Sequence, residues 1–211
     1  MHTRVKTAKG RRVGSTRWLE RQLNDPYVQR AKREGWRARS IYKLEEIDAQ
    51  FRLLRKGARV LDLGAAPGSW SQYAARRGAR VVAVDLLPVD PIGGVELVQG
   101  DFLDPEVQAE LVRRLAGPAD LVLSDMAPAA TGQRAVDRLR AEGIGEAVLD
   151  FAARVLRPGG ACLLKLVKGA EAPLVARAKG DFRSTRLLRP KATRSDSSEI
   201  FLLALERQPR P

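Results

Sequence analysis

The sequence predicts an α/β fold of the Rossmann-like type: a mostly parallel seven-stranded sheet with an antiparallel last strand and helices on both faces. From residue 58 onward, short apolar runs typical of strands alternate with stretches typical of helices. Such alternation favours a parallel sheet whose crossover helices cover both faces. The last two apolar runs are separated only by PKATRSDSS, residues 190–198. This connection is too short for a crossover helix, so we expect the last pair of strands to be antiparallel.

The region before the sheet is expected to be helical and basic. Residues 1–16 are predicted to form a flexible basic arm, and residues 17–57 a helical extension. The first helix would begin after Ser15 or Thr16, and the second would run over residues 26–35. Ser40 can cap a third helix over residues 41–51. The apolar residues of this third helix fall on one face at helical spacing: Ile41, Leu44, Ile47 and Phe51.

Residues 58–206 are expected to form one domain, with no linker long enough to divide it. Strands are predicted at residues 58–63, 79–87, 95–101, 119–126, 161–167, 184–189 and 199–205. Helices are predicted at residues 69–78, 105–117, 134–160 and 171–180.

The charge of the chain points to a polyanionic partner. The 211 residues carry a net charge of +13, and residues 1–60 hold 17 Lys and Arg against 6 Asp and Glu. A second basic stretch, residues 177–194, has seven basic residues and one acid. A solvated basic surface would explain the excess of charge but not its concentration in two blocks. We therefore expect a nucleic acid as partner, contacted mainly through its phosphates.

Other features exclude several classes of protein. No apolar run is long enough to span a membrane, and the basic N-terminus lacks the apolar stretch of a secretory signal. The single cysteine, Cys162, excludes an internal disulfide framework and suggests the reducing cytoplasm. Because His2 and Cys162 are the only residues of their kinds, we expect no structural zinc site and no other metal.

A glycine loop follows the first predicted strand, in the segment DLGAAPGSW, residues 62–70. Gly64 and Gly68 would let the backbone approach a ligand closely. The loop lacks the G-x-G-x-x-G pattern of dinucleotide sites and the G-K-S/T of P-loops, which disfavours an oxidoreductase. Asp85 stands 21 residues beyond Gly64, the place of a carboxylate that binds ribose hydroxyls, and Asp101 could contact an adenine amino group. A ligand with adenosine at one end and a carboxylate at the other fits, and S-adenosylmethionine is such a ligand.

Further polar residues are expected at the same rim, because ligands bind at the carboxyl ends of parallel strands. Leu86 and Phe102 adjoin the two acids, Asp125 follows the fourth strand, and Lys165 lies in the fifth. Glu199 begins the antiparallel last strand, so it would lie at the same edge. Trp70 lies on the first turn of the helix after the glycine loop, where its ring could line the cofactor site or simply pack in the core.

Several segments together resemble the FtsJ-type RNA 2′-O-ribose methyltransferases, and in particular the bacterial members that act on the A-loop of large-subunit ribosomal RNA. The resemblance rests on DLGAAPGSWSQY, DLLPVDPIGGVELVQGDF, SDMAP, LLKLVKG and RPKATRSDSSEIFLLA, and it runs from about Trp18 to Ala204. It implies a class I S-adenosylmethionine-dependent methyltransferase fold. It also implies cofactor contacts at Gly68, Trp70, Asp85, Asp101 and Asp125. Two departures are Ala129, where the family usually has Asn, and Lys168, where an uncharged residue is more common.

The same resemblance implies a Lys-Asp-Lys-Glu tetrad, which falls here on Lys43, Asp125, Lys165 and Glu199. A ribose 2′-hydroxyl is a weak nucleophile, so it needs positioning and help with its proton. We expect Lys165 to assist deprotonation, either as a cation that stabilises alkoxide charge or as a base. Lys43 and Glu199 would orient the network, and Asp125 would serve both cofactor and network.

The expected function is thus methylation of a ribose 2′-OH, at a uridine in the A-loop of large-subunit rRNA, by a monomer acting on the ribosomal subunit. The open alternatives are transfer to tRNA or an mRNA cap and a non-catalytic RNA-binding protein with this fold. Candidate RNA contacts are drawn from the basic blocks and the rim: Arg11, Arg12, Arg17, Arg37, Arg39, Lys168, Lys191 and Arg194.

Overall fold

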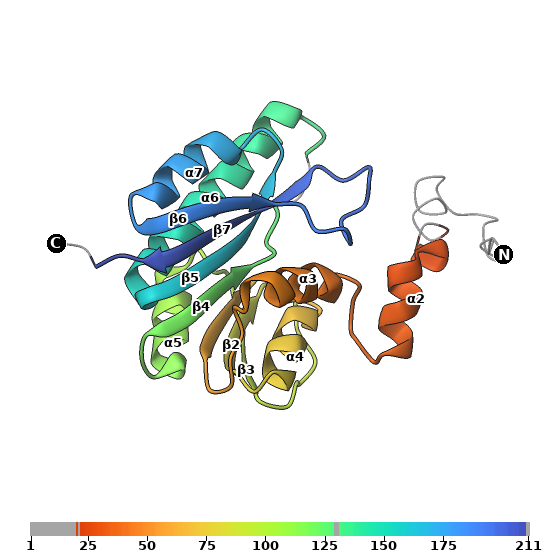
Figure 1. Cartoon of the computed structure of the whole chain (residues 1–211), viewed down its shortest axis with the longest axis horizontal. Helices are drawn as coiled ribbons and strands as arrows, with labels where there is room; N and C mark the ends of the chain where they lie inside the picture. The colour runs from red at the N-terminus through yellow and green to blue at the C-terminus, as the bar shows by residue number, and fades with distance from the viewer. Residues whose placement is uncertain (1–19, 21, 129–130, 210–211) are drawn as a thin grey trace.

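The structure is a computed structural model that describes residues 20, 22–128 and 131–209. The predicted arm with its candidate RNA contacts Arg11 and Arg12, the candidate contact Arg17 of the extension, the predicted cap of the first helix, and Ala129 all lie outside these residues. The described chain forms one twisted sheet flanked by helices, as Figure 1 shows.

The sheet has seven strands in the order β3-β2-β1-β4-β5-β7-β6. Neighbours among the first five strands run parallel, whereas β7 lies antiparallel between β5 and β6. The predicted mostly parallel sheet with an antiparallel last strand is therefore confirmed. The strands are β1 (Arg59–Leu63), β2 (Arg80–Asp85), β3 (Val95–Gln99), β4 (Ala119–Ser124), β5 (Leu156–Val167), β6 (Phe182–Leu188) and β7 (Glu199–Arg207).

Helices cover both faces of the sheet (Figure 1). The helices are α2 (Pro26–Arg33), α3 (Ile41–Phe51), α4 (Ser69–Arg76), α5 (Pro105–Leu115), α6 (Arg134–Val155) and α7 (Glu171–Lys179). One core contains α3 and α4 with residues such as Val81 and Ala83 of β2, and the other contains α5, α6 and α7 with Val82 and Val84 of the same strand. A central strand buried on both sides must be apolar at every position, which is why β2 reads as a continuous apolar run.

The helix starts follow local capping chemistry in part. Asp25 caps α2 by accepting from the N–H groups of Tyr27 at 3.0 Å and Val28 at 3.4 Å, and Pro26 occupies the first turn. The helix predicted to begin after Ser40 is present, but the predicted cap is wrong, because the Ser40 side chain makes no capping bond. Its hydroxyl lies instead 2.7 Å from the hydroxyl of Ser69, at the start of α4.

The boundary between α6 and β5 also differs from the expectation of a helix over residues 134–160. The helix ends at Val155, and Leu156 already pairs with Ala119 of β4. The pairing shifts register and resumes at Ala161, opposite Leu121. Pro158 explains this early end, because proline cannot donate to the helix ladder and biases the preceding residue towards an extended conformation.

Within the described part of the chain, no helix has the length and apolar character needed to cross a membrane.

Candidate active site

A cavity of about 470 Å³ opens at the carboxyl ends of β1, β2, β3 and β4. This is the edge at which parallel sheets bind ligands, since loops and helix starts meet there. Six of the residues predicted to bind the cofactor line this cavity: Gly64, Asp85, Leu86, Asp101, Phe102 and Asp125.

The two acids after β2 and β3 are held by their own loops. Asp85 accepts the N–H of Ala66 on one carboxylate oxygen and the N–H of Leu87 on the other, both at 2.8 Å. Asp101 accepts the N–H of Leu103 at 2.9 Å. A carboxylate has about four lone-pair sites, so each acid keeps acceptor capacity for hydroxyl or amino groups of a ligand. These contacts fix both carboxylates at the edge of the cavity.

The glycine loop packs too closely for side chains at its two glycines. A Cβ on Gly64, which has φ +79°, would lie 2.3 Å from Cγ of Met126. A Cβ on Gly68, which has φ +101°, would lie 2.6 Å from Cδ1 of Ile92. Gly64 therefore lets the loop approach the cavity, whereas Gly68 is needed for packing against the loop after β2. The structure does not bring Gly68 to the lining of this cavity.

Trp70 is a core residue in this structure, which corrects the expectation that its ring walls the cofactor. Its side chain is 2% exposed and does not line the cavity. The indole Nε1 donates to the backbone carbonyl of Ser40 at 2.9 Å, and the ring centroid lies 5.8 Å from that of Phe201. Buried indoles normally need a partner for their N–H, and this bond supplies it. Trp70 thus joins α4 to α3 and β7.

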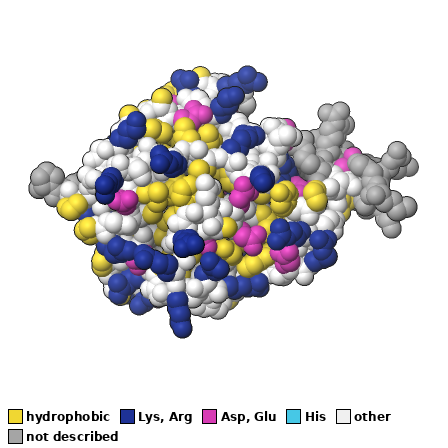
Figure 2. Space-filling model, viewed as in Figure 1, with side chains coloured by type: hydrophobic (Ala, Val, Ile, Leu, Met, Phe, Trp, Pro, Cys, Tyr) yellow, Lys and Arg dark blue, Asp and Glu magenta, His cyan; other side chains and the backbone are white. Residues whose placement is uncertain are grey.

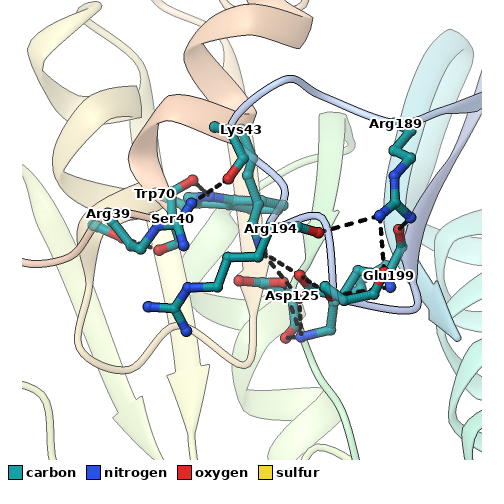
Figure 3. Close-up of polar contacts among 12 residues, drawn as sticks. Arg39, Ser40, Lys43, Trp70, Asp125, Arg189, Arg194 and Glu199 are labelled. Atoms are coloured by element: carbon teal, nitrogen blue, oxygen red, sulfur yellow. Dashed lines mark hydrogen bonds and ion pairs between the residues drawn. The ribbon is translucent and has the colours of Figure 1, made fainter. Parts of the chain in front are cut away.

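The four residues of the implied tetrad form one network of contacts, which reaches the cavity through Asp125. Figure 3 labels three of them, Lys43, Asp125 and Glu199. Lys43 of α3 donates from Nζ to both carboxylate oxygens of Glu199, at 2.9 Å each. Lys165 of β5 lies with Nζ 2.9 Å from Oδ1 of Asp125 and 3.9 Å from Oε1 of Glu199. The same Nζ also donates to the backbone carbonyl of Asp125 at 2.5 Å. Two ammonium groups and two carboxylates therefore form one continuous network.

The electrostatics of this network keep Glu199 ionised. Burial acts to raise the pKa of Glu199, but Lys43, Lys165 and the hydroxyl of Ser197 outweigh it and lower that pKa below its usual value. Ser197 Oγ lies 3.0 Å from Oε2 of Glu199. The carboxylate is thus a fixed negative charge between two cations.

A second cavity, of about 410 Å³, lies beside the tetrad; three cations, Lys43, Arg39 and Arg194, and two acids, Asp196 and Glu199, are among the residues that line it. Both arginines are held by the buried carboxylate of Asp25. Oδ2 of Asp25 lies 2.7 Å from Nη1 of Arg39 and 2.9 Å from Nη2 of Arg194. Arg39 also donates from Nη2 to the backbone carbonyl of Ala192, whereas Arg194 donates to Asp25 from Nε and Nη2 and keeps Nη1 as a donor for an anionic ligand.

The other predicted RNA contacts divide into two groups. Lys168 and Lys191 are exposed. Arg37 is instead committed to the protein, because its guanidinium donates to the backbone carbonyls of Pro67 at 3.0 Å, Asp90 at 2.8 Å and Pro91 at 2.8 Å. This side chain fastens the glycine loop to the loop after β2, a role that its place in a basic block does not indicate.

The second basic block is also partly engaged within the protein. Arg177 contacts Asp150 and Asp181, Arg183 contacts Glu206, and Arg189 donates to backbone carbonyls. Figure 2 shows that Lys and Arg side chains on the visible face are spread over the surface, with Asp and Glu side chains among them. A count of charges along the sequence thus overstates the cations that are free for an external partner.

Sequence reasoning missed Asp62, which lies within β1, one residue before the strand ends at Leu63. Its carboxyl group is 1% exposed and accepts the hydroxyl of Ser71 at 2.6 Å. Burial is the main cause that raises its pKa to about 7, with Asp125 and Asp85 adding to the effect and the Ser71 bonds opposing it. The signal in the sequence was a carboxylate inside an otherwise apolar strand, where burial is costly.

The described residues contain no group of three or more His, Cys, Asp or Glu side chains that could hold a metal ion.

Comparison with known proteins is consistent with this geometry. The model of the FtsJ-like methyltransferase family matches residues 36–207. The chain is 50% identical over 202 residues to "Ribosomal RNA large subunit methyltransferase E" of Gluconobacter oxydans, covering 95% of this chain and 75% of that protein. It is also 50% identical over 208 residues to the protein of the same name in Acidiphilium cryptum, covering 98% and 92%. A crystal structure of a ribosomal RNA methyltransferase from Plasmodium falciparum superposes with a TM-score of 0.75 at 27% identity, covering 83% of this chain and 100% of that one.

Proposed function

The chain belongs to the FtsJ-like methyltransferase family, and on this premise we propose that it transfers a methyl group from S-adenosylmethionine to a ribose 2′-hydroxyl of large-subunit ribosomal RNA. The acceptor that the sequence resemblance implies is a uridine of the A-loop. The observation that carries the proposal is the meeting of Lys43, Asp125, Lys165 and Glu199 beside a cofactor-sized cavity.

The proposed substrate class is supported by the relatives. The relatives from Gluconobacter oxydans and Acidiphilium cryptum, each 50% identical to this chain, are both named as methyltransferases of large-subunit ribosomal RNA, and they align with 95% and 98% of this chain. The basic cavity at the tetrad suits the phosphate that flanks an acceptor ribose. Arg39 and Arg194 are already oriented there by Asp25, so little side-chain freedom is lost when an anion binds.

The proposed cofactor fits the larger cavity in size and chemistry. A volume of about 470 Å³ lies within the usual range for small-molecule sites. Asp85 would accept the ribose hydroxyls and Asp101 the adenine amino group, while Phe102 provides an apolar wall. Asp125 lines this cavity and also contacts Lys165, so it connects the cofactor site to the tetrad.

The proposed mechanism assigns each tetrad residue a task. The bound cofactor supplies an electrophilic methyl group on a sulfonium centre. Lys165 assists loss of the 2′-hydroxyl proton to solvent water: its ammonium group, oriented from one side by Asp125, stabilises the negative charge that develops on the 2′-oxygen. Glu199 lies on the other side of Lys165 Nζ and is held by Lys43. Fixed charges aimed at the reacting oxygen stabilise developing alkoxide charge without reorganisation during the reaction.

The proposed catalytic unit includes the N-terminal extension. We propose that residues 17–57 extend a methyltransferase domain of residues 58–206, and α3 of this extension contributes Lys43 to the site. The enzyme would act as a monomer in the cytoplasm, on the assembled or assembling large ribosomal subunit, and without a metal. Lys168 and Lys191 would add RNA contacts from the exposed surface.

The decisive experiment maps 2′-O-methylation of ribosomal and transfer RNA in cells with and without the gene. The proposal expects loss of one modified uridine in large-subunit rRNA. Loss confined to tRNA would overturn the substrate assignment. Absence of any change, together with no transfer of labelled methyl from S-adenosylmethionine to ribosomal subunits by the purified protein, would indicate a non-catalytic RNA-binding protein.

A further inference from the structure

Arg189 lies at the end of β6, where the chain enters the connection to β7. Its place in the second basic block suggests a solvent-facing cation for RNA. The side chain is exposed, and its guanidinium also contacts the protein backbone: Nη1 donates to the carbonyl of Glu199 at 3.1 Å, and Nη2 donates to the carbonyls of Ser197 at 2.9 Å and Arg194 at 3.2 Å. A fourth carbonyl, that of Ser195, lies 3.5 Å from Nη2. Figure 3 shows Arg189 beside the backbone that leads into Glu199.

The segment held in this way, residues 194–199, carries three groups of the site. Arg194 contacts Asp25 and lines the second cavity. Ser197 contacts Glu199, and Glu199 receives both bonds from Lys43. Arg189 contacts backbone carbonyls at both ends of this segment. The same backbone is also held by Lys168, whose N–H donates to the carbonyl of Ser198 at 2.9 Å, and Glu199 pairs with Val167 of β5. Arg189 is therefore one of the contacts that set the position of the Glu199 carboxylate, and of these three it is the one made by a side chain that can be replaced.

We propose that Arg189 is a positioning residue for methyl transfer. Its guanidinium donates hydrogen bonds to backbone carbonyls of residues 194–199 and so positions Glu199 and Arg194 relative to Lys43 and the acceptor ribose. This inference rests on the proposed function for its catalytic consequence. A guanidinium presents donors from a rigid planar fork, which can serve several carbonyls at once. A lysine carries the same charge on a single nitrogen and cannot span the same set of acceptors. The charge at position 189 is therefore not enough for this role.

The test compares R189K and R189A with R186K and R186A. Arg186 is an exposed arginine of β6, three residues before Arg189, so its variants make the same changes of charge without touching the segment. We expect R189K and R189A each to lower kcat for large-subunit rRNA by about 10²-fold, because a small misplacement of a catalytic group has that effect. The KM for RNA of R189K should stay within about threefold of wild type, since charge is kept and charge supplies most of the phosphate affinity. The two Arg186 variants should keep the kcat of wild type.

Two further measurements separate positioning from general damage and from RNA contact. The Kd for S-adenosylmethionine should be unchanged in R189K, which shows that the sheet and the cofactor cavity are intact. Amide hydrogen exchange across residues 194–199 should accelerate in both Arg189 variants, because the segment loses the hydrogen bonds from the guanidinium. It should not accelerate in either Arg186 variant. The exchange measurement does not require activity, so it tests the fastening even if the proposed reaction is not observed.

Either of two results would overturn the inference. The first is a wild-type kcat in R189K with unchanged exchange over residues 194–199. The second is a higher KM for RNA in R189A that R189K restores to the wild-type value and that becomes smaller relative to wild type as the salt concentration rises, which would make Arg189 an RNA contact.

Discussion

Lys43 on α3 and Glu199 at the start of β7, 156 positions apart in the sequence, are joined by two hydrogen bonds of 2.9 Å from one ammonium group to both carboxylate oxygens. This bond links the helical extension to the antiparallel strand and places both groups beside Lys165. It is one of the causes that keep the pKa of Glu199 below its usual value despite burial.

Replacing Lys43 by Met removes the cation nearest to Glu199, and we expect the pKa of Glu199 to rise as a result. The carboxylate would then become protonated at higher pH than in the wild type. The acidic limb of the kcat–pH profile should therefore move to higher pH, with kcat at neutral pH lowered by about tenfold or more. Profiles of K43M and of the exposed control K56M, recorded from pH 5 to 9, check this. An acidic limb that stays in place would refute the coupling.

Lys165→Ala should abolish most methyl transfer while leaving cofactor binding intact. The side chain contacts Asp125 and approaches Glu199, and it does not line the cofactor cavity. Loss of a group that assists proton removal typically costs about 10²–10⁴-fold in kcat. Single-turnover transfer and calorimetric titration of S-adenosylmethionine measure the two effects, with K179A on α7 as the matched lysine control. Near-normal turnover in K165A would contradict the proposed mechanism.

Asp85→Ala should weaken S-adenosylmethionine binding. The variant loses the proposed acceptor for the ribose hydroxyls and also the bonds that fasten Ala66 and Leu87. Hydrogen bonds to charged groups contribute about 1.5–3 kcal/mol, so the Kd should rise roughly 10-fold to 100-fold. D90A changes an exposed acid of the adjacent loop and should bind normally. Equal dissociation constants for D85A and wild type would refute the ribose role.

Arg37→Ala should also raise the Kd for S-adenosylmethionine, because the arginine fastens Pro67 of the glycine loop to the carbonyls of Asp90 and Pro91. We expect an increase of roughly threefold to tenfold from the loss of these charged donors. The salt dependence of RNA binding should match that of R33A, an exposed arginine of α2. If R37A instead binds S-adenosylmethionine normally and its RNA affinity depends less on salt than that of R33A, then Arg37 is an RNA contact, as the sequence predicts.

The buried Asp62 makes a pH-dependent contribution to stability. Its pKa of about 7 in the folded protein lies above the ordinary value of about 3.9 expected in the unfolded chain. Below about pH 4 the carboxyl group is neutral in both the folded and the unfolded state, so its titration does not change the free energy of unfolding. Between about pH 4 and pH 7 the unfolded state ionises first, so the folded state loses stability relative to a non-titrating residue, up to about 4 kcal/mol.

Asp62→Asn removes this titration while its amide oxygen can still accept from Ser71. The free energy of unfolding of D62N minus that of wild type should therefore increase as pH rises from about 4 to about 7 and then level off. Urea unfolding of both proteins at several pH values measures this difference. A difference that is constant across that range would show that Asp62 has an ordinary pKa.

The order of elements and the cofactor edge could be predicted because they follow from local patterns. Alternating strand and helix periods indicate a parallel sheet, and the short connection before Glu199 allows only an antiparallel pair. The positions of Asp85 and Asp101 follow from the same rule, since residues that follow parallel strands meet at one edge. The helix predicted over residues 134–160 ends earlier, at Val155, because Pro158 disfavours the helical conformation in the residue before it, an effect that helical periodicity does not register.

The sequence by itself therefore predicted the mostly parallel sheet, which the structure confirms, and through family resemblance it named four residues that the structure brings into contact. Only the tertiary structure decided what individual side chains do there. Trp70 packs in the core, Arg37 and Arg189 fasten backbone, and Asp25 orients two arginines. Composition and periodicity indicate whether a residue is buried or exposed and which secondary structure its neighbours in the chain favour. They do not report which distant carbonyl or carboxylate lies within 3 Å of an arginine, because that depends on how separate elements pack.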